Sequence, residues 1–290
     1  MRLAGWPNGS SPCAVPLSKV QREILRLLSA HRDPESYIAG SSYLTRQGAR
    51  YSGDIDIFHD REDRVARAAS EDVATLEAAG LAVNWQRREP LFYQAIVTRG
   101  DDSTKLEWVV DSDFRFYPAQ RDPDFGYVLH PADLATNKIM AAAGRREPRD
   151  VVDLVDIHEH ILPLGAVAWA AVGKSLGFTP EGLINEVRRL ARYREEDFNR
   201  VASDPPVNPT EIMRRLHEAL EAADAFVRRM PTDKIGMLFL QDGQPVQPDP
   251  DRLDAYVSHA GARRGHWPSS SEIGHAMLEH YGEIGPKPPT

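Results

Sequence analysis

The sequence predicts an α/β fold, in which a mixed β-sheet with its helices is followed by a mainly helical region. Three observations lead to this prediction. Residues 53–58 (Gly-Asp-Ile-Asp-Ile-Phe) alternate acidic and apolar side chains with the period of a strand. Three further strand-like segments follow between residues 81 and 111, and their short connections favour antiparallel pairs. From Pro131 onward, apolar residues recur mostly at helical spacing.

Length and charge narrow the class of protein. At roughly 150 residues per domain, a chain of 290 residues suggests about two domains. The single cysteine, Cys13, excludes an internal disulfide framework and a Cys-rich zinc module. With 35 basic and 43 acidic side chains the net charge is −8, so the chain is not expected to coat nucleic acid through bulk charge. A local basic groove is still compatible with this composition.

No membrane segment is expected. The first sixteen residues are rich in Gly, Pro and Ser, lack the apolar run of a secretory signal, and are expected to be a flexible lead-in. The most apolar stretch, Ile161 to Gly173, is shorter than the roughly 20 residues that span a bilayer. We therefore expect a soluble, cytoplasmic protein.

Eight elements are expected before residue 118, and we assign them to a core over residues 17–128. Ser18 is a favoured helix cap, Gly40 ends the first strand in a turn, and Gly80 suits the end of the third helix. In chain order the expected elements are the helix 18–28, the strand 36–40, the helix 41–50, the strand 53–58, the helix 61–79 and the strands 81–87, 91–98 and 105–111.

The second half is expected to form a helical region over residues 129–230 and a small hairpin with an irregular tail over 231–290. Pro131 suits the first turn of a helix, and residues 205–209 contain three prolines that separate two helices. Asp242-Gly243 favours a hairpin turn after an apolar run from residue 234 to 241. The expected helices are 131–143, 150–162, 164–176, 180–201 and 209–229.

One short stretch carries most of the chemistry. Asp54 and Asp56 lie two apart on the predicted strand, so both side chains leave the same face of the sheet. Two carboxylates held this close repel each other unless a cation neutralises them. Oxygen ligands of this kind suit Mg²⁺. The pair therefore predicts a magnesium site.

An anion site is expected directly upstream. The predicted strand ends at Gly40, and a helix begins at Ser41 or Ser42, whose hydroxyls lie beside free backbone N–H groups. These groups suit phosphate. A phosphate site and a Mg²⁺ site within one short stretch point to a nucleoside triphosphate.

These residues resemble the nucleotidyltransferase superfamily that includes DNA polymerase beta. Its pattern is an apolar residue, Gly and Gly or Ser, a gap of about nine to thirteen residues, and then Asp-apolar-Asp. Gly40-Ser41, the twelve residues 42–53 and Asp54-Ile-Asp56 fit it. The resemblance implies a third carboxylate on a later strand. Glu107 is preferred because it lies mid-strand, and Asp111 is the alternative on the same face.

A second set of residues resembles one branch, the AbiEii-type nucleotidyltransferases, which are toxins of bacterial abortive-infection and toxin–antitoxin systems. That branch has a lysine on a helix, an arginine about seven residues on, an Arg-Asp pair with Asp-Leu opening the next helix, and Arg-x-Ser before the Asp pair. Here the matching residues are Lys138, Arg145, Arg149-Asp150, Asp153-Leu154 and Arg50-Tyr51-Ser52. The resemblance covers about residues 36–160.

The resemblance implies a nucleotidyltransferase fold and a reaction that moves a nucleoside monophosphate from an NTP to an acceptor. Asp54, Asp56 and Glu107 would hold Mg²⁺, two ions in all, and Lys138 and Asp150 would join them in catalysis. The nucleotide would be bound by Gly40, Ser41, Ser42, Arg50, Ser52, Lys138 and Arg145. The expected acceptor is a tRNA 3′ end, and a cognate antitoxin protein is an expected partner. A protein acceptor and a catalytically silent binding protein are the alternatives.

Several of these residues also have ordinary structural interpretations. Lys138 fits a solvated helix position, Asp150 fits the cap of the following helix, and Arg145, Arg146 and Arg149 fit a basic loop as well as a phosphate or RNA contact. The histidines of His158-Glu-His160 are two apart on a predicted helix and point to different sides, which argues against a metal site. Gly173-Lys-Ser175 lacks the first glycine of a P-loop.

Overall fold

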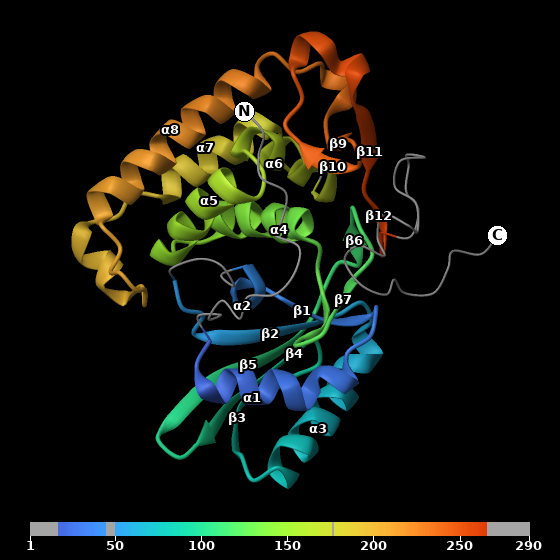
Figure 1. The fold of residues 1–290 in the computed structure, drawn as a ribbon, viewed down its shortest axis with the longest axis vertical. Helices are drawn as coiled ribbons and strands as arrows, with labels where there is room; N and C mark the ends of the chain where they lie inside the picture. The colour runs from blue at the N-terminus through green and yellow to red at the C-terminus, as the bar shows by residue number, and fades with distance from the viewer. Residues whose placement is uncertain (1–16, 45–49, 176, 266–290) are drawn as a thin grey trace, which may run out of the picture.

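The computed structural model describes residues 17–44, 50–175 and 177–265. Its centre is a seven-stranded mixed sheet in the order β3-β4-β5-β2-β1-β8-β7 (Figure 1). The β2–β5 and β1–β8 pairs are parallel, and the other neighbours are antiparallel. The strands are β1 Ser36–Ala39, β2 Asp54–His59, β3 Ala82–Glu89, β4 Phe92–Arg99, β5 Asp102–Val110, β7 Gln120–Asp122 and β8 Gly126–Val128.

Two helices, α1 (Lys19–Leu28) and α3 (Glu62–Ala78), cover one face of the sheet (Figure 1). They pack on side chains such as Ile55 and Ile57, which leave β2 toward this face and are fully buried. Ser18 caps α1, with Gln21 completing a capping box, as the sequence indicated. The alternating pattern of β2 thus directs its apolar residues into a core and its aspartates to the opposite face.

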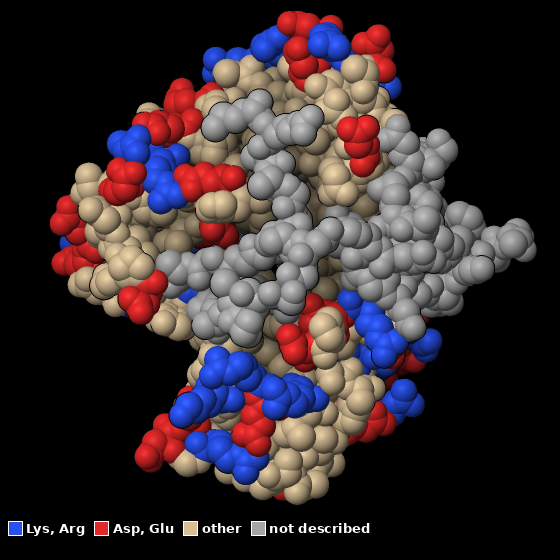
Figure 2. All heavy atoms as spheres, in the orientation of Figure 1, with Lys and Arg blue, Asp and Glu red and all other residues tan. Residues whose placement is uncertain are grey.

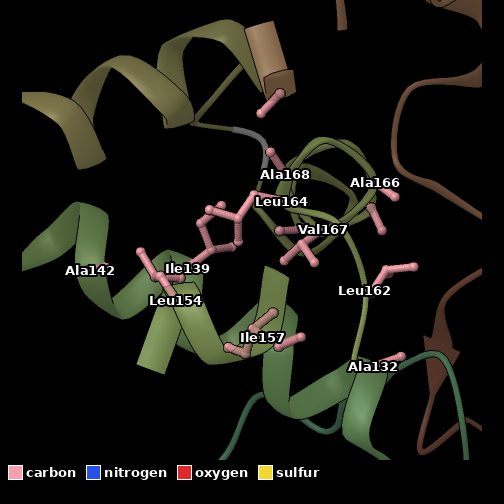
Figure 3. Packing of buried hydrophobic residues seen from close by; sticks show 14 of the residues in the cluster. Ala132, Ile139, Ala142, Leu154, Ile157, Leu162, Leu164, Ala166, Val167 and Ala168 are labelled. Carbon is pink, nitrogen blue, oxygen red and sulfur yellow. The ribbon is translucent and has the colours of Figure 1, made fainter. Parts of the chain in front are cut away.

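On the opposite side of the sheet lies a helical layer, whose helices pack against one another (Figure 1). Its interior is built from small and branched apolar side chains such as Ala132, Ile139, Leu154, Ile157 and Val167, which Figure 3 shows facing one another. The small alanine side chains let these helices pack closely, and this close packing holds in place the side chains that face the sheet. The helices are α4 Pro131–Gly144, α5 Pro148–His160, α6 Leu164–Ala171, α7 Pro180–Leu190 and α8 Pro209–Val227.

Smaller elements complete the described chain. A three-stranded sheet in the order β10-β9-β11 packs against α6, and the short strands β6 and β12 pair with each other. The expected hairpin at Asp242-Gly243 is present between β9 and β10. The remaining elements are α2 Ser41–Leu44, β6 Phe114–Arg115, β9 Met237–Gln241, β10 Gln244–Val246, β11 Val257–Ala260, β12 Ala262–Arg263 and the 3₁₀ turns Ser29–His31, Val172–Lys174, Glu195–Arg200, Thr232–Lys234 and Pro250–Ala255.

The α/β class and its mixed sheet are confirmed, but three helix predictions need correction. The helix expected over 180–201 ends at Leu190, since Ala191 leaves helical backbone angles, and a separate 3₁₀ turn begins at Glu195, where the Asp197 carboxylate accepts a hydrogen bond from the backbone N–H of Arg194. The helix expected over 150–162 begins earlier, at Pro148, so Asp150 lies in its first turn and does not cap it. The helix expected over 164–176 ends at Ala171 and continues as the 3₁₀ turn.

The helix expected over 41–50 is described only in its first turn, α2. Residues 45–49 lie outside the described residues, and Arg50 is extended, in a β-bridge with Ser203. The expected lead-in 1–16 and the tail from residue 266 also lie outside them. The division into segments 17–128, 129–230 and 231–290 stays a prediction.

Charge is distributed unevenly over the surface. Figure 2 shows acidic and basic side chains interspersed over the helical layer, and a group of Lys and Arg over the α1 side of the sheet. Lys19, Arg22 and Arg26 are exposed on α1. Within the described ranges, no helix combines the length and apolar character needed to cross a bilayer.

Candidate active site

A pocket of about 400 Å³ lies between the polar face of the sheet and helix α4. Its volume falls in the range of about 300–1,000 Å³ that is usual for small-molecule sites. The strands β2, β4 and β5 form its floor, and the end of β1 and the start of α2 close one side. Among the expected site residues, its lining contains Gly40, Ser41, Asp54, Asp56, Glu107, Lys138 and Arg145.

The three expected carboxylates come together on this floor. Strands β2 and β5 are parallel neighbours, with Asp56 opposite Glu107 and Asp54 opposite Lys105. Side chains that are directly opposite each other on paired strands leave the same face of the sheet, and so do side chains two residues apart on one strand. Asp54, Asp56 and Glu107 therefore all line the pocket. Asp111, the alternative third carboxylate, follows the end of β5 and accepts a hydrogen bond of 2.8 Å from the Tyr37 hydroxyl, outside the pocket lining.

Lys105 is a site residue that the sequence analysis missed. Its ammonium lies 3.2 Å from Asp54 Oδ2 and 2.8 Å from Glu107 Oε1, so it bridges the two carboxylates. On the other side of Asp54, Arg149 Nη1 lies 3.3 Å from the same Oδ2 atom. Burial alone would raise the pKa of Asp54, but the charges of Arg149 and Lys105 outweigh burial and lower it. The Asp54 carboxylate is therefore held ionised.

Asp56 is in the opposite situation. Among the described residues no side chain or backbone group hydrogen-bonds or ion-pairs with its carboxylate. Burial, followed by the negative charges of Asp54 and Glu107, raises the pKa of Asp56 to about 7. The charges of Lys138 and Lys105 offset this rise only in part, and a carboxylate without a direct ionic partner beside two others is an arrangement that a cation would stabilise.

Gly40 makes room for Asp56. Its φ is +73°, and a Cβ atom at this position would lie 2.0 Å from Asp56 Oδ2. Any other residue would therefore both strain the backbone and displace the carboxylate. The apolar-Gly-Ser pattern of the sequence thus has a direct steric reason at the end of β1.

Ser41 and Lys138, which the sequence analysis expected to bind phosphate, lie in contact with each other in the pocket lining. Lys138 Nζ donates to Ser41 Oγ at 3.0 Å and lies 2.9 Å from Asp153 Oδ2. Only about 8% of the Lys138 side chain is exposed, so this lysine is not a solvated helix residue. Asp153 is a second residue whose role the sequence analysis missed, since it holds Lys138 in place from α5.

Three expected nucleotide-binding residues lie outside the pocket lining. Arg50 makes a bidentate pair with Asp153 at 2.8 and 3.0 Å and is buried. Ser52 Oγ donates to the backbone oxygen of Asp54 at 2.8 Å, and Ser42 Oγ faces the backbone oxygen of Ala39 at 3.5 Å. These residues support the aspartate strand and the first turn of α2.

Asp150 also acts through a neighbour. It accepts two hydrogen bonds from Arg145, at 2.8 and 2.9 Å, and lies 3.7 Å from Lys138. Arg145 lines the pocket, and Asp150 does not. Helices α4 and α5, with the segment between them, thus hold the cations Lys138, Arg145 and Arg149 in the pocket lining.

The donor set fits a divalent cation, although no three His, Cys, Asp or Glu side chains already converge as a formed metal site in the described part of the chain. Three carboxylates share one floor, and Asp56 has no counter-ion of its own. Lys105 lies between the other two, so a cation would have to displace its ammonium.

The two motifs set aside in the sequence have other contacts. His158 Nδ1 accepts from the backbone N–H of Leu164 at 3.1 Å, and His160 Nδ1 lies 3.0 Å from Asp156 on the same helix. Lys174 of the Gly-Lys-Ser segment donates to Asn137 Oδ1 at 2.8 Å. Neither segment lines the pocket.

Comparison with known proteins gives a distant likeness in shape. No family model and no curated protein matches the chain. MenT4, a nucleotidyltransferase toxin of Mycobacterium tuberculosis, shares 18% identity at a TM-score of 0.47, over 74% of this chain and 83% of its own. A protein of H. pylori provisionally classed as a nucleotidyltransferase shares 14% identity at a TM-score of 0.46, over 73% and 94%. At these values neither structure assigns an activity, so the side chains of this chain must carry one.

Gly40→Ala should destabilise the fold and disturb the site, because its Cβ would meet the Asp56 carboxylate at a positive φ. A non-glycine residue in this region costs on the order of 1–3 kcal/mol. The measurement is urea unfolding of both proteins. Gly53→Ala is the matched control, since nothing lies within 4 Å of a Cβ there. Equal unfolding free energies for the two variants would contradict the steric role of Gly40.

Proposed function

We propose that the protein is a Mg²⁺-dependent nucleotidyltransferase that moves a nucleoside monophosphate from an NTP to an acceptor hydroxyl. The observation that carries the proposal is the meeting of three carboxylates and the hydrogen-bonded Ser41–Lys138 pair in one pocket. In the reaction, a bond forms between the acceptor oxygen and the α-phosphorus. The bond between the α- and β-phosphates breaks, and pyrophosphate leaves.

Asp54, Asp56 and Glu107 are the residues that would hold Mg²⁺, with two ions expected. When bound, such ions activate the attacking hydroxyl and neutralise charge on the triphosphate. Glu107 is the carboxylate that we propose takes the proton of the acceptor hydroxyl. Gln94 Nε2 donates to Glu107 Oε1 at 2.7 Å and orients this carboxylate from β4.

The cations of the helical layer would stabilise the leaving group. Ser41 and the backbone at the start of α2 would bind the terminal phosphates, with Lys138 beside them. Arg145, whose Nε and Nη2 atoms are bound to Asp150, would add the positive charge of its guanidinium and its remaining Nη1 donor. These charges are fixed before substrate binds, so they need little reorganisation during the reaction.

We further propose that the acceptor is a tRNA 3′ end and that the protein acts as an AbiEii-like toxin controlled by a cognate antitoxin. In support of an RNA acceptor, a second cleft of about 250 Å³ adjoins the pocket and shares Arg149 with it. Arg146, Tyr193 and Arg200 line this cleft, and the Arg146 guanidinium lies 5.2 Å from the Tyr193 ring centre. Guanidinium groups beside an aromatic ring suit phosphates and unstacked bases.

Transfer should be visible directly. Purified protein should transfer label to bulk tRNA when it is supplied with Mg²⁺ and each of four α-labelled NTPs. The double variant Asp54→Ala with Asp56→Ala should transfer label at least about a thousandfold more slowly, because metal-based charge stabilisation supplies several kcal/mol. A protein lysate, supplied as a separate acceptor, tests protein modification. Unchanged transfer by the double variant would contradict the proposed site. No label in either acceptor, from folded protein, would favour a catalytically silent binding protein.

Mg²⁺ affinity should depend on pH through Asp56. Its pKa is raised to about 7, so below pH 7 a proton competes with the metal for this carboxylate, and above pH 7 it does not. Affinity should therefore fall by up to about tenfold per pH unit below 7 and level off above it. Calorimetric Mg²⁺ titrations at several pH values measure this. Asp56→Asn should remove the dependence, and an unchanged slope in that variant would exclude Asp56 as its source.

Binding of tRNA should depend on the second cleft. Arg146→Glu with Arg200→Glu should raise the KM for tRNA about tenfold and lower the salt dependence of binding, because each lost phosphate contact removes roughly 0.7–0.9 from the log–log slope. The KM for NTP should not change. The control is the double variant Arg61→Glu with Arg67→Glu. It changes the net charge by the same amount at two exposed arginines at α3, on the other side of the sheet. Equal effects of the two double variants would show that only net charge matters.

A further inference from the structure

The floor of the pocket changes from charged to apolar along the strands. On β2 the residues that face the pocket run Asp54, Asp56, Phe58, and on the neighbouring β5 they run Lys105, Glu107, Val109. Phe92 of β4 pairs with Val109 and extends the apolar end. The proposed chemistry uses only the charged part of this floor.

Helix α4 repeats the same change along the pocket wall. Leu134, near its start, is apolar, Lys138 lies one turn later, and Arg145 lies at its end. Both walls therefore change from apolar to charged side chains along their length, with the carboxylates on the strands and Lys138 and Arg145 on the helix side. A nucleoside triphosphate has the same asymmetry, with a flat apolar base at one end and several negative charges at the other.

Asn137 is a polar residue of α4 that lines the pocket. In the sequence it lies close to Leu134, which belongs to the apolar end of the pocket. Its amide orientation is fixed by Lys174, whose ammonium lies 2.8 Å from Asn137 Oδ1. An ammonium group can only donate, so it must face the amide oxygen. Lys174 is in turn held 3.2 Å from Asp133, and only about 8% of its side chain is exposed. Because Lys174 binds the amide oxygen of Asn137, the NH₂ group of this side chain stays available as a hydrogen-bond donor.

No hydrogen-bond partner for that NH₂ group exists among the described residues. A half-buried amide donor with no partner at the wall of a pocket is suited to bind an acceptor atom of a ligand. Ring nitrogens and carbonyl oxygens at the edge of a nucleobase are such acceptors. The aromatic rings of Phe58 and Phe92 offer apolar area for the base itself.

We propose that the apolar end of the pocket, formed by Phe58, Phe92, Val109 and Leu134, is the nucleobase subsite, and that Asn137 donates a hydrogen bond to the edge of the base. The inference rests on the proposed function, because it takes the bound molecule to be an NTP with its phosphates toward Ser41 and Lys138. Lys174 and Asp133 are positioning residues, since they orient Asn137 without lining the pocket.

A base-free probe separates this inference from the proposed function. Inorganic triphosphate carries the phosphate charges of an NTP but no base, so its affinity reports the cationic end alone. We would measure the dissociation constants of the four NTPs and of triphosphate, each with Mg²⁺ and without an acceptor. The proteins are the natural chain, Asn137→Leu, Phe92→Leu and Lys174→Met, with their unfolding midpoints compared.

Asn137→Leu should weaken the best-bound NTP about five- to tenfold, the effect of about one hydrogen bond, and leave triphosphate binding unchanged. Lys174→Met should weaken binding of the same NTP by a smaller factor, because the Asn137 amide is still present but is free to rotate. Phe92→Leu retains an apolar side chain and should reduce NTP binding through lost stacking. Gln86→Leu, an exposed polar residue on β3, is the control and should change neither.

Three results would overturn the inference. The first is equal affinity of the natural chain for NTP and triphosphate, since the base would then contribute nothing. The second is loss of triphosphate binding in Asn137→Leu to the same extent as loss of NTP binding. The third is binding of neither probe by folded protein, which would contradict the proposed function itself, and the base subsite with it.

Discussion

The repulsion between three carboxylates on two neighbouring strands is the constraint on which the rest of the site depends. Asp54, Asp56 and Glu107 are fixed on one face because the other faces of β2 and β5 are needed for the core under α1 and α3. The sheet cannot separate them without losing that core. Their charge must therefore be balanced by groups brought in from elsewhere.

The surrounding elements supply that balance in layers. Lys105 bridges Asp54 and Glu107, and Arg149 reaches Asp54 from α5. Behind them, Asp153 holds both Arg50 and Lys138 from one buried position. Burial would raise the pKa of Asp153, but these two cations outweigh it and lower the pKa. Removing one partner of such a buried pair is expected to cost on the order of 3–5 kcal/mol.

The sequence predicted side-chain positions correctly where the two-residue alternation of a strand determines which face each side chain leaves. The alternation around Asp54 and Asp56 correctly placed both side chains on one face, whereas Gly40 was expected to end the strand in a turn and is found also to make room for Asp56. Lys105 was predictable on the same grounds, because it lies two residues before Glu107 on one strand. The Arg50–Asp153 pair was not, since it joins positions 103 residues apart. The end of α7 at Leu190 was also missed, because the separate 3₁₀ turn after it is capped by the Asp197 side chain, a contact that apolar spacing does not reveal.

Under the proposed function, binding becomes an exchange of counter-ions. In the ligand-free arrangement the carboxylates use Lys105 and Arg149, both of which line the pocket and retain some solvent exposure. Metal ions bring positive charge and the triphosphate brings negative charge, so the two together add little net charge to a half-buried site. The metals would take over the carboxylates, and the released cations would be free to face phosphate. Either ligand alone would complete only part of this exchange, because a triphosphate without metal would meet three carboxylates, and metal without triphosphate would leave the cations without a counter-charge. The geometry therefore favours joint binding of metal and nucleotide over binding of either by itself.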